Sequence, residues 1–292
     1  TKPEEMIRKL FYSEHVFRRM PGANQFTEIK QMGLEYIGAD TGYAEAEVIS
    51  LACQSLAAIN QEYFLGVSHM GYISALMDEL KIDDPTQEIL LQAIGRKSAG
   101  DIAIALKDIC LTKKQQAAVF SLIDLPASLD EALDQLRSMA LNTDMLNAIS
   151  ELEAVFSACE VWGLKPRLRM ELSLLNDLEY YNGIVFQGYI KGLPRAILSG
   201  GRYDKLLQRF GKSQPAVGFA IYLNDIWGAF VQPRDYDVDI LLIYTDQTPC
   251  QIAEAVQEIL AEGKTVLAAK DIPPEISARQ VVQLNDILAT KE

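Results

Sequence analysis

The chain is short of positive charge. It carries 27 lysine and arginine residues against 40 aspartate and glutamate residues, which gives a formal net charge of −13 with its two histidines neutral. Sequence-independent binding of nucleic acid depends on clustered lysine and arginine side chains that neutralise phosphates. The composition therefore disfavours a general nucleic-acid-binding protein.

Cysteine and histidine are also scarce. The four cysteines form no C-x-x-C pair, and only His15 and His69 could join them as metal ligands. Closely spaced pairs are the usual sign of a zinc site or a redox motif. We therefore expect no metal site, no cofactor and no disulfide framework, and a reducing compartment, the cytoplasm, is the simplest location.

Long apolar runs are missing as well. No stretch approaches the roughly 18 apolar residues of a membrane-spanning helix, and no charged-then-apolar leader begins the sequence. The 292 residues are 49% apolar, enough to bury a sizeable core. At roughly 100 to 200 residues per domain we expect about two domains. A helical membrane protein and a disordered chain are both excluded.

The first part of the chain predicts a β-hairpin and a helix. Residues 10–17 and 26–37 are strand-like, with a turn around Pro21, and should pair in antiparallel fashion. Thr41 is a candidate N-cap for a helix over residues 44–59, whose apolar positions follow helical spacing. A short apolar strand follows at residues 63–67.

The rest of the chain changes character twice. Residues 70–159 have apolar positions at helical period, which predicts a wholly helical insertion. Strand-like sequence resumes at 162–175, and a hairpin is expected between 180–190 and 195–198. A helix at 205–210, a strand at 217–221 and a helix at 222–230 should follow. The last part of the chain predicts a βαβ unit, with strands at 237–244 and 265–269 and a helix at 249–260 between them. The fold class that follows is α+β, with an antiparallel sheet, helices, a helical insertion and a small C-terminal α/β domain. The expected domains are a core in two parts (1–69 and 161–232), the insertion (70–160) and the small domain (233–292).

Five motifs now occur in a recognisable order: VFRR (16–19), QMGLE (31–35), LEYYNGIVFQ (178–187), SGGRYDKLL (199–207) and AVGFAI (216–221). Together they resemble the core of the histidyl-tRNA synthetase family of class II aminoacyl-tRNA synthetases, or of its non-synthetase paralogues, the regulatory subunits of ATP phosphoribosyltransferase. The resemblance implies a class II synthetase-like antiparallel sheet, and the small domain resembles a shortened anticodon-binding domain.

Two departures from the synthetase pattern bear on activity. The resemblance leads us to expect arginines shortly before the double tyrosine and after the GFAI strand, where this chain has Asn176 and Asp225. Such cations stabilise the triphosphate of ATP, at about 3 to 4 kcal/mol for each donor in comparable sites. The motif-2 arginine is retained as Arg18, but Met20 replaces an expected acidic residue, and Tyr222 replaces a glycine against which a purine would lie. Adenylate formation should therefore fail.

The amino-acid side of the pocket, in contrast, is retained. By resemblance Gln31 and Glu35 contact the α-amino group and the imidazole of histidine, and their spacing places both on one face of a strand. The full set of histidine-binding residues that the resemblance implies is Gln31, Glu35, Tyr180, Tyr181, Gly200 and Gly201. Since strand neighbours point to opposite faces, we expect only one of the two tyrosines, Tyr181, to line the pocket.

Plainer interpretations exist for several of these residues. Gln31 and Glu35 alone could form a solvated strand face, the Gly200–Gly201 pair could mark any tight turn, and Arg202 could be a structural ion-pair residue. His69 is more typical of a satisfied structural histidine than of a catalyst. The acidic clusters at 83–84 and 235–239 are expected to be solvated loops.

The resulting expectation is a regulatory subunit with no catalysis of its own and L-histidine as ligand. By resemblance, it partners the short-form catalytic subunit, which joins ATP to phosphoribosyl pyrophosphate in the first step of histidine biosynthesis, and it assembles as a dimer of synthetase-like cores within a hetero-oligomer. tRNA and membrane partners are not expected. A divergent histidyl-tRNA synthetase and a synthetase-like interaction module remain the alternatives. The motif-1 segment of the family is not readable before Leu10, and we expect the sequence to omit it.

Overall fold

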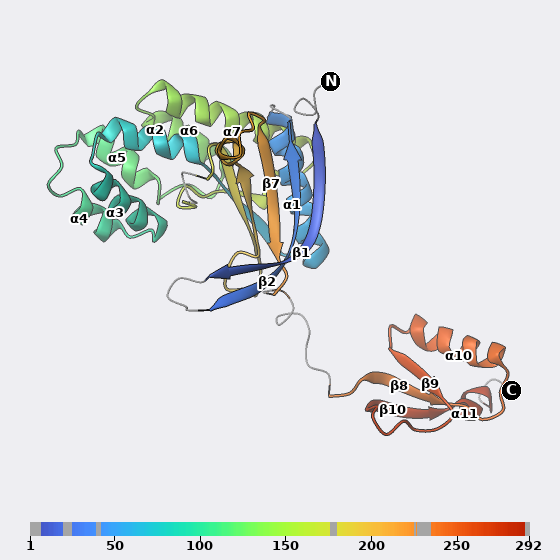
Figure 1. Cartoon of the computed structure of the whole chain (residues 1–292). Helices are drawn as coiled ribbons and strands as arrows, with labels where there is room; N and C mark the ends of the chain where they lie inside the picture. The colour runs from blue at the N-terminus through green and yellow to red at the C-terminus, as the bar shows by residue number, and fades with distance from the viewer. Residues whose placement is uncertain are drawn as a thin grey trace. The chain divides into compact units, whose positions relative to one another are not determined.

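The chain divides into two compact units, Thr1–Phe230 and Val231–Glu292 (Figure 1). The computed structural model describes residues 7–19, 25–38, 42–175, 180–224, 226 and 235–289. No helix within these ranges is long and apolar enough to cross a membrane. The expected N-cap Thr41 and most of the helix expected at 222–230 lie outside the described residues. The two units are therefore considered separately.

A seven-stranded mixed sheet organises the larger unit, in the order β1-β2-β7-β6-β5-β3-β4. Its strands are β1 (Arg8–Arg19), β2 (Phe26–Ile37), β3 (Tyr63–His69), β4 (Leu168–Met170), β5 (Ile184–Ile190), β6 (Leu198–Arg202) and β7 (Ala216–Tyr222). Every neighbouring pair is antiparallel except β3 and β4, which are parallel. The predicted β1–β2 hairpin and the α+β class are confirmed, and the architecture is that of a class II synthetase-like core.

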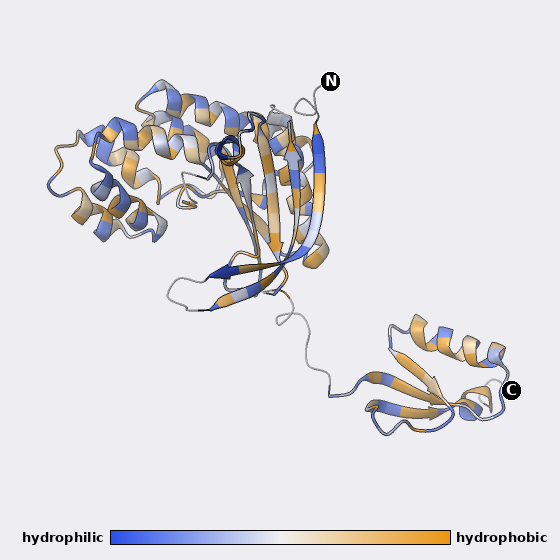
Figure 2. Cartoon of the chain, in the orientation of Figure 1, coloured by the Kyte–Doolittle hydropathy of each residue, from blue (hydrophilic) through white to orange (hydrophobic). Residues whose placement is uncertain are grey.

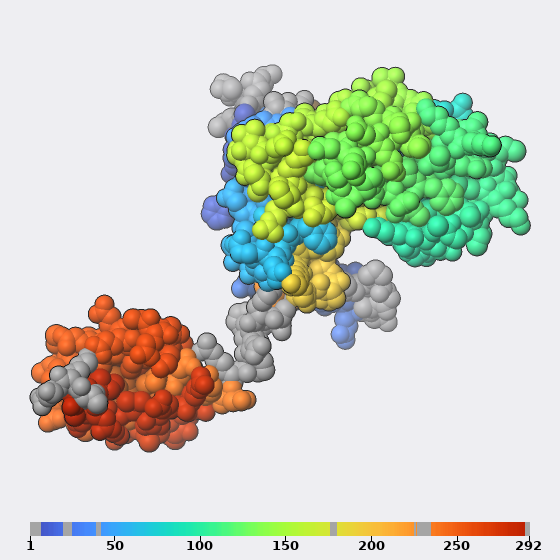
Figure 3. Space-filling model, turned by 180° about the vertical axis from the view of Figure 1, so that it is seen from behind, coloured from blue at the N-terminus to red at the C-terminus, as the bar shows by residue number. Residues whose placement is uncertain are grey.

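One face of the sheet packs on helix α1 (Gly42–Ile59). Buried Val48, Ala52 and Leu56 supply the apolar stripe of the helix, which the sequence predicted. The packing is close, because a Cβ atom added at Gly188 of β5 would lie 2.7 Å from Leu56 Cδ1. Seen from behind in Figure 3, α1 (light blue) lies beside the last helix of the helical stretch (yellow-green). The core of this unit therefore lies between the sheet and α1.

The opposite face of the sheet has a floor of small residues. Directly paired residues on adjacent strands point to the same face, and one such row crosses the middle of the sheet. This row consists of Tyr12, Gly33, Ala220, Ser199, Gln187 and Gly66. Because four of its members are glycine, alanine or serine, this face leaves room for a ligand above the strands.

Between β3 and β4 the chain is helical, as its apolar spacing predicts. The elements are α2 (Met70–Leu80), α3 (Asp84–Gly95), α4 (Ala99–Ala105), α5 (Lys113–Ser121), α6 (Leu129–Met139), α7 (Thr143–Val161) and the short 3-10 helix η2 (Lys165–Arg167). Figure 2 shows the mixed apolar and polar colouring typical of amphipathic helices. Side-chain caps begin several of them: Asp83 accepts from the Thr86 backbone, and Thr112 forms a capping box with Gln115. The insertion boundaries remain a prediction.

Two strand expectations were wrong. In the region 162–175 only β4 is a strand, and it has three residues. The partner of β5 is Leu198–Arg202 rather than 195–198, so Gly200 and Gly201 lie inside β6 and not in a turn. The glycines suit a crowded strand, because a Cβ at Gly200 would collide with the backbone oxygen of Gly218 on β7. Close packing against the neighbouring backbone inside the sheet therefore explains the two glycines, and a turn does not.

The smaller unit contains the predicted βαβ motif. Strands β8 (Val238–Ile243) and β9 (Val266–Ala269) are parallel, and α10 (Pro249–Ala261) connects them. A third parallel strand, β10 (Ala278–Gln283), pairs with β8 and is followed by α11 (Leu284–Ala289). Ile240, Leu242 and Leu284 form the centre of its own small core. The domain limits that the sequence predicted stay a prediction.

Candidate functional site

A pocket of about 410 Å³ opens on the sheet face opposite α1. Strands β1, β2, β6 and β7 and the segment before β5 contribute its walls. Its lining residues are Tyr12, Arg18, Gln31, Glu35, Tyr180, Tyr181, Ser199, Tyr203, Gly218, Phe219, Ala220 and Tyr222. The structure thus brings together six residues that the sequence singled out: Arg18, Gln31, Glu35, Tyr180, Tyr181 and Tyr222. A cavity of this size suits a small molecule.

Glu35 is the single acidic residue among those lining residues. Its side chain accepts a hydrogen bond from the Tyr203 hydroxyl. Burial raises the pKa of the Glu35 carboxyl above its ordinary value, while the hydrogen bond from Tyr203 acts in the opposite direction. A Cβ at Gly218 would collide with Glu35 Oε2, so the glycine makes room for the carboxylate. Glu35 can therefore serve as a held, charged acceptor for an N–H donor.

Gln31 is nearly buried, and both ends of its amide have partners. Its Nε2 donates to the Tyr12 hydroxyl over 3.2 Å, and its Oε1 accepts from Arg18 Nη2 over 3.5 Å. The Arg18 guanidinium also lies 5.9 Å from the centre of the Tyr222 ring. Burial is the main cause that raises the pKa of Tyr12, to about 12, so this phenol stays protonated. The contacts orient the Gln31 amide within the pocket.

The expectation that only one of the two adjacent tyrosines lines the pocket was wrong. Tyr180 and Tyr181 both line it, with ring centroids 4.5 Å apart and an interplanar angle of 65°. They precede β5 and are not in a strand, so the alternation of strand side chains does not apply to them. Burial raises the pKa of both phenols. The two rings form one aromatic wall.

An ion-pair network fixes this segment against β6. Arg202 Nε lies 2.7 Å from Asp204 Oδ2, and Arg202 Nη1 lies 3.8 Å from the buried Glu45 on α1. Asn182 Nδ2 donates to Asp204 Oδ2 over 3.1 Å, and Asn182 Oδ1 accepts from the Asp204 backbone. Arg202 thus has the structural role that was its plainer interpretation, and the network positions the neighbouring tyrosines.

The two glycines of β6 face different ways. A Cβ at Gly201 would lie 2.9 Å from Tyr181 Cδ1, so Gly201 borders the aromatic wall. A Cβ at Gly200 would meet Phe219 and Phe186, and Phe186 is buried in the core. The structure therefore brings Gly201, but not Gly200, beside the pocket. Asn176 and Asp225 lie outside the described residues.

Several lining residues were not singled out from the sequence. Tyr203 belongs to the SGGRYDKLL motif, and Tyr12 lies opposite Gly33, midway between Gln31 and Glu35 in the β1–β2 register. Gly218 is opposite Glu35. The period-2 pattern of β7 could have identified Gly218 as a pocket residue, but only with the strand order known.

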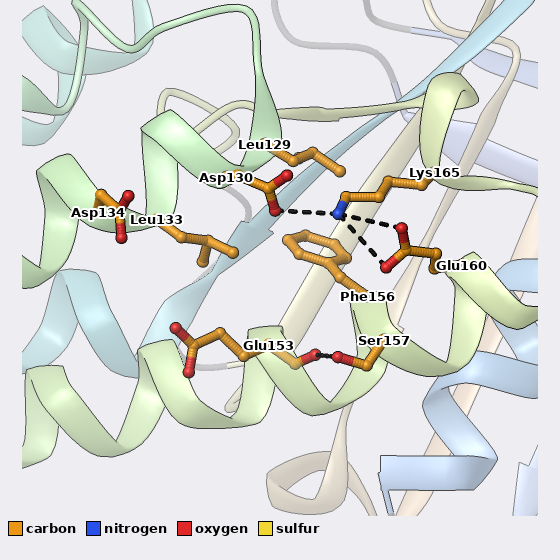
Figure 4. Close-up of a pocket in the computed structure, with 9 residues that line it drawn as sticks. All are labelled: Leu129, Asp130, Leu133, Asp134, Glu153, Phe156, Ser157, Glu160 and Lys165. Atoms are coloured by element: carbon orange, nitrogen blue, oxygen red, sulfur yellow. Dashed lines mark hydrogen bonds and ion pairs between the residues drawn. The ribbon is translucent and has the colours of Figure 1, made fainter.

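A second, smaller hollow of about 150 Å³ lies between α6 and α7 (Figure 4). Lys165 fills its charged part, with Nζ 3.0 Å from Asp130 Oδ1 and 3.4 Å from Glu160 Oε2, and Phe156 lies beneath it. These carboxylates already have a cation. No group of three histidine, cysteine, aspartate or glutamate side chains that could hold a metal occurs in the described part of the chain.

The remaining sequence candidates have structural contacts. His69 is buried, with Nε2 3.0 Å from Glu151 Oε2 on α7, as a structural histidine would be. Asp83 caps α3, and Asp239 accepts hydrogen bonds from the backbone and hydroxyl of Thr265. The acidic clusters that contain these aspartates therefore include residues with local structural roles.

Comparison with known proteins places these features in a family. The model of the family described as histidyl-tRNA synthetase matches residues 2–226. A protein named ATP phosphoribosyltransferase regulatory subunit, from Desulfitobacterium hafniense, is 30% identical over 259 residues, which are 88% of this chain and 66% of that protein. The chain spans 56% to 68% of the length of five relatives that carry this name.

Solved structures have the same fold. One from Bacillus halodurans, titled as an ATP phosphoribosyltransferase regulatory subunit/histidyl-tRNA synthetase, has a TM-score of 0.73 at 22% identity and covers 95% of this chain and 73% of its own. An ATP phosphoribosyl transferase complex from Thermotoga maritima has a TM-score of 0.59 at 21% identity, covering 76% of this chain and 75% of its own. At these identities the likeness concerns the fold.

Proposed function

Because this chain belongs to the histidyl-tRNA synthetase family, we propose that it is a non-catalytic member, a regulatory subunit of ATP phosphoribosyltransferase that binds L-histidine. Relatives near 30% identity carry the name of that subunit. They extend beyond the part that this chain spans, so the activity of the whole protein belongs to the proposal. In this role the subunit would support the catalytic subunit in the first step of L-histidine biosynthesis and contribute to the feedback control of that step by histidine.

The charge of the pocket carries the proposal. Among its described lining residues Arg18 is the single cation and Glu35 the single anion. Histidine fits such a pair, because its carboxylate can meet the cation and its imidazole N–H the anion, whereas the triphosphate of ATP is normally held by several cations. Tyr222 adds a ring where the family has a glycine. The pocket is therefore suited to an amino acid and poorly suited to adenylate formation.

In this proposal each group meets one part of histidine. Glu35 accepts an imidazole N–H, Gln31 contacts the α-amino group, and Arg18 faces the carboxylate. Tyr180 and Tyr181 pack against the ring, and Gly201 borders the ligand beside Tyr181. The absence of arginine at Asn176 and Asp225 completes the loss of the synthetase reaction.

The proposed partner is the short-form catalytic subunit. The Thermotoga maritima neighbour is titled as an ATP phosphoribosyl transferase complex, and its fold likeness to this chain supports the idea of such a partner. We further propose that the chain works in the cytoplasm, in a hetero-oligomer built on a dimer of synthetase-like cores. In this proposal tRNA is not a partner. The domain arrangement given above, with a core in two parts, belongs to the same proposal.

Titration calorimetry with L-histidine tests the ligand. We expect binding, and we expect Glu35→Gln to weaken it roughly 10- to 150-fold, because a hydrogen bond to a charged group is worth about 1.5 to 3 kcal/mol. Glu14→Gln is the matched control, since Glu14 is an exposed acid on β1 outside the pocket. Equal affinity in Glu35→Gln and the unaltered chain would move the site elsewhere.

The alternatives have their own tests. The family match favours a divergent histidyl-tRNA synthetase as the second candidate. Histidine-dependent ATP–pyrophosphate exchange, or charging of the cognate tRNA, would establish it and reject the present proposal. Mixing with a short-form phosphoribosyltransferase should raise product formation. If neither activation nor co-elution on gel filtration occurs, an interaction module of another pathway is the better interpretation.

A further inference from the structure

A groove of about 590 Å³, separate from the candidate histidine pocket, lies where β3 and β4 begin and β5 ends. Its lining shares no residue with that pocket. It contains three cationic side chains, Arg167, Arg169 and Lys191, and one acidic side chain, Glu62. In a chain with a net charge of −13, this excess of positive charge at one concave place requires an explanation.

The two arginines have no carboxylate partner among the described residues. Arg169 Nη1 donates to the backbone oxygens of Pro166 and Leu168, over 3.0 and 2.8 Å. The Arg167 guanidinium lies over the ring of Tyr63, 4.9 Å from its centre. A guanidinium held over a ring keeps its in-plane N–H donors available for an anion. Lys191 differs, since its Nζ lies 2.6 Å from Glu62 Oε1. Within the described ranges, the groove therefore has two guanidinium groups without a carboxylate at ion-pair distance.

An aromatic platform lines the same groove, on the face of β3 to which Arg169 belongs by register. Phe64 and Tyr189 are paired across β3 and β5, with ring centroids 4.8 Å apart and an interplanar angle of 12°. Phe64 remains 41% exposed although its neighbours Tyr63 and Leu65 are buried. A cross-strand aromatic pair stabilises a sheet, but that role does not require cations nearby. A planar ring could stack on the exposed side of Phe64.

We propose that this groove binds a nucleoside phosphate. The guanidinium groups of Arg167 and Arg169 match the geometry of phosphate oxygens, which accept paired N–H donors. Phe64 supplies a stacking surface for the base, and the volume suits a small ligand. The shared chemistry fits a free mononucleotide or one nucleotide of a single-stranded RNA. The site is independent of the histidine pocket and of the proposed regulatory function.

Calorimetry on the full chain with AMP, adenosine, inorganic phosphate and a five-nucleotide RNA tests the proposal. AMP should bind at least tenfold more tightly than adenosine or phosphate, because it alone uses both parts of the groove. If the RNA binds more tightly than AMP with the same response to the variants below, the site is one for RNA. Failure of both AMP and RNA to bind at millimolar concentration would overturn the proposal.

Variants locate the binding. Arg167→Gln, Arg169→Gln and Phe64→Leu should each weaken AMP binding about tenfold or more, whereas Arg167→Lys should lose less than Arg167→Gln because it keeps the charge. Thermal unfolding checks that each variant is folded, and two separate arginine variants keep the test valid if one is not.

Matched controls lie elsewhere on the chain. Arg279 lies over the Tyr236 ring in the small unit, 5.9 Å from its centre. Phe210 is 72% exposed and directly follows helix α8 (Asp204–Arg209). Arg279→Gln and Phe210→Leu should leave AMP binding unchanged. Glu35→Gln should leave it unchanged too. Loss of AMP binding in Glu35→Gln, or equal losses in Arg279→Gln and Arg167→Gln, would reject the groove as the site.

Discussion

The hydroxyl of Tyr203 should control how stability depends on pH. Tyr203→Phe removes one oxygen atom and leaves the ring, so the main loss is the hydrogen bond to Glu35. Hydrogen bonds to charged groups are worth about 1.5 to 3 kcal/mol, against about 0.5 to 1.5 for neutral ones. One pKa unit corresponds to about 1.4 kcal/mol. The pKa of Glu35 in the variant should therefore rise further above its ordinary value.

The sign of the effect follows from burial. Because burial raises the pKa of Glu35 in the folded chain above its ordinary value of 4.5, the folded chain holds the proton more tightly than the unfolded chain. Stability from this group is full below the ordinary value and falls as the pH rises through the folded pKa. In Tyr203→Phe the fall continues to higher pH. The difference in free energy of unfolding between the two proteins should therefore grow from about 0.5 to 1.5 kcal/mol at pH 4 to about 1.5 to 3 kcal/mol at pH 8.

Urea unfolding of both proteins at a series of pH values measures this difference. Tyr180→Phe is the control, because its ring lines the same pocket while Tyr203 supplies the hydrogen bond recorded to Glu35. The control should show no pH-dependent loss. A Tyr203→Phe difference that does not change between pH 4 and pH 8, or that Tyr180→Phe reproduces, would refute the reasoning.

Two further substitutions test the packing and the capping. Gly188→Ala should lower the free energy of unfolding by about 1 to 3 kcal/mol, because its Cβ would lie 2.7 Å from Leu56 Cδ1; unchanged stability in urea unfolding would show that α1 moves freely. Thr248→Ala should cost the small unit about 1 kcal/mol, because Thr248 forms a capping box with Gln251 at the start of α10. Thr248→Ser should retain most of that stability in unfolding monitored by circular dichroism. An equal loss in both variants would contradict the capping role.

Local patterns predicted the strands well where the chain alternates. The second strand of the hairpin has the limits expected, Phe26–Ile37, because its apolar and polar positions alternate. The prediction failed at Tyr180 and Tyr181, because alternation was applied to residues that precede the strand. It also missed the short edge strand β10, because the consecutive exposed polar residues Arg279 and Gln280 interrupt the alternation of apolar and polar positions.

The pocket was only partly predictable for a different reason. Gln31 and Glu35 belong to one strand, so spacing alone places them on one face. Tyr203 and Gly218 reach Glu35 from β6's end and from β7, far along the sequence. Such contacts depend on the strand order of the sheet, which a single sequence does not reveal. The resemblance pointed to the pocket residues Gln31 and Glu35, and the fold showed which residues contact them.

The parallel pairing of β3 with β4 has a consequence for how the chain folds. Leu65 and Leu168 are partners although about a hundred residues, most of them in helices, separate them. Contacts within the helical stretch are local and form quickly, whereas joining the two strands must first close this long loop. The helices should therefore form early and bring their two ends together, and closure of the sheet edge should be the slower event in refolding.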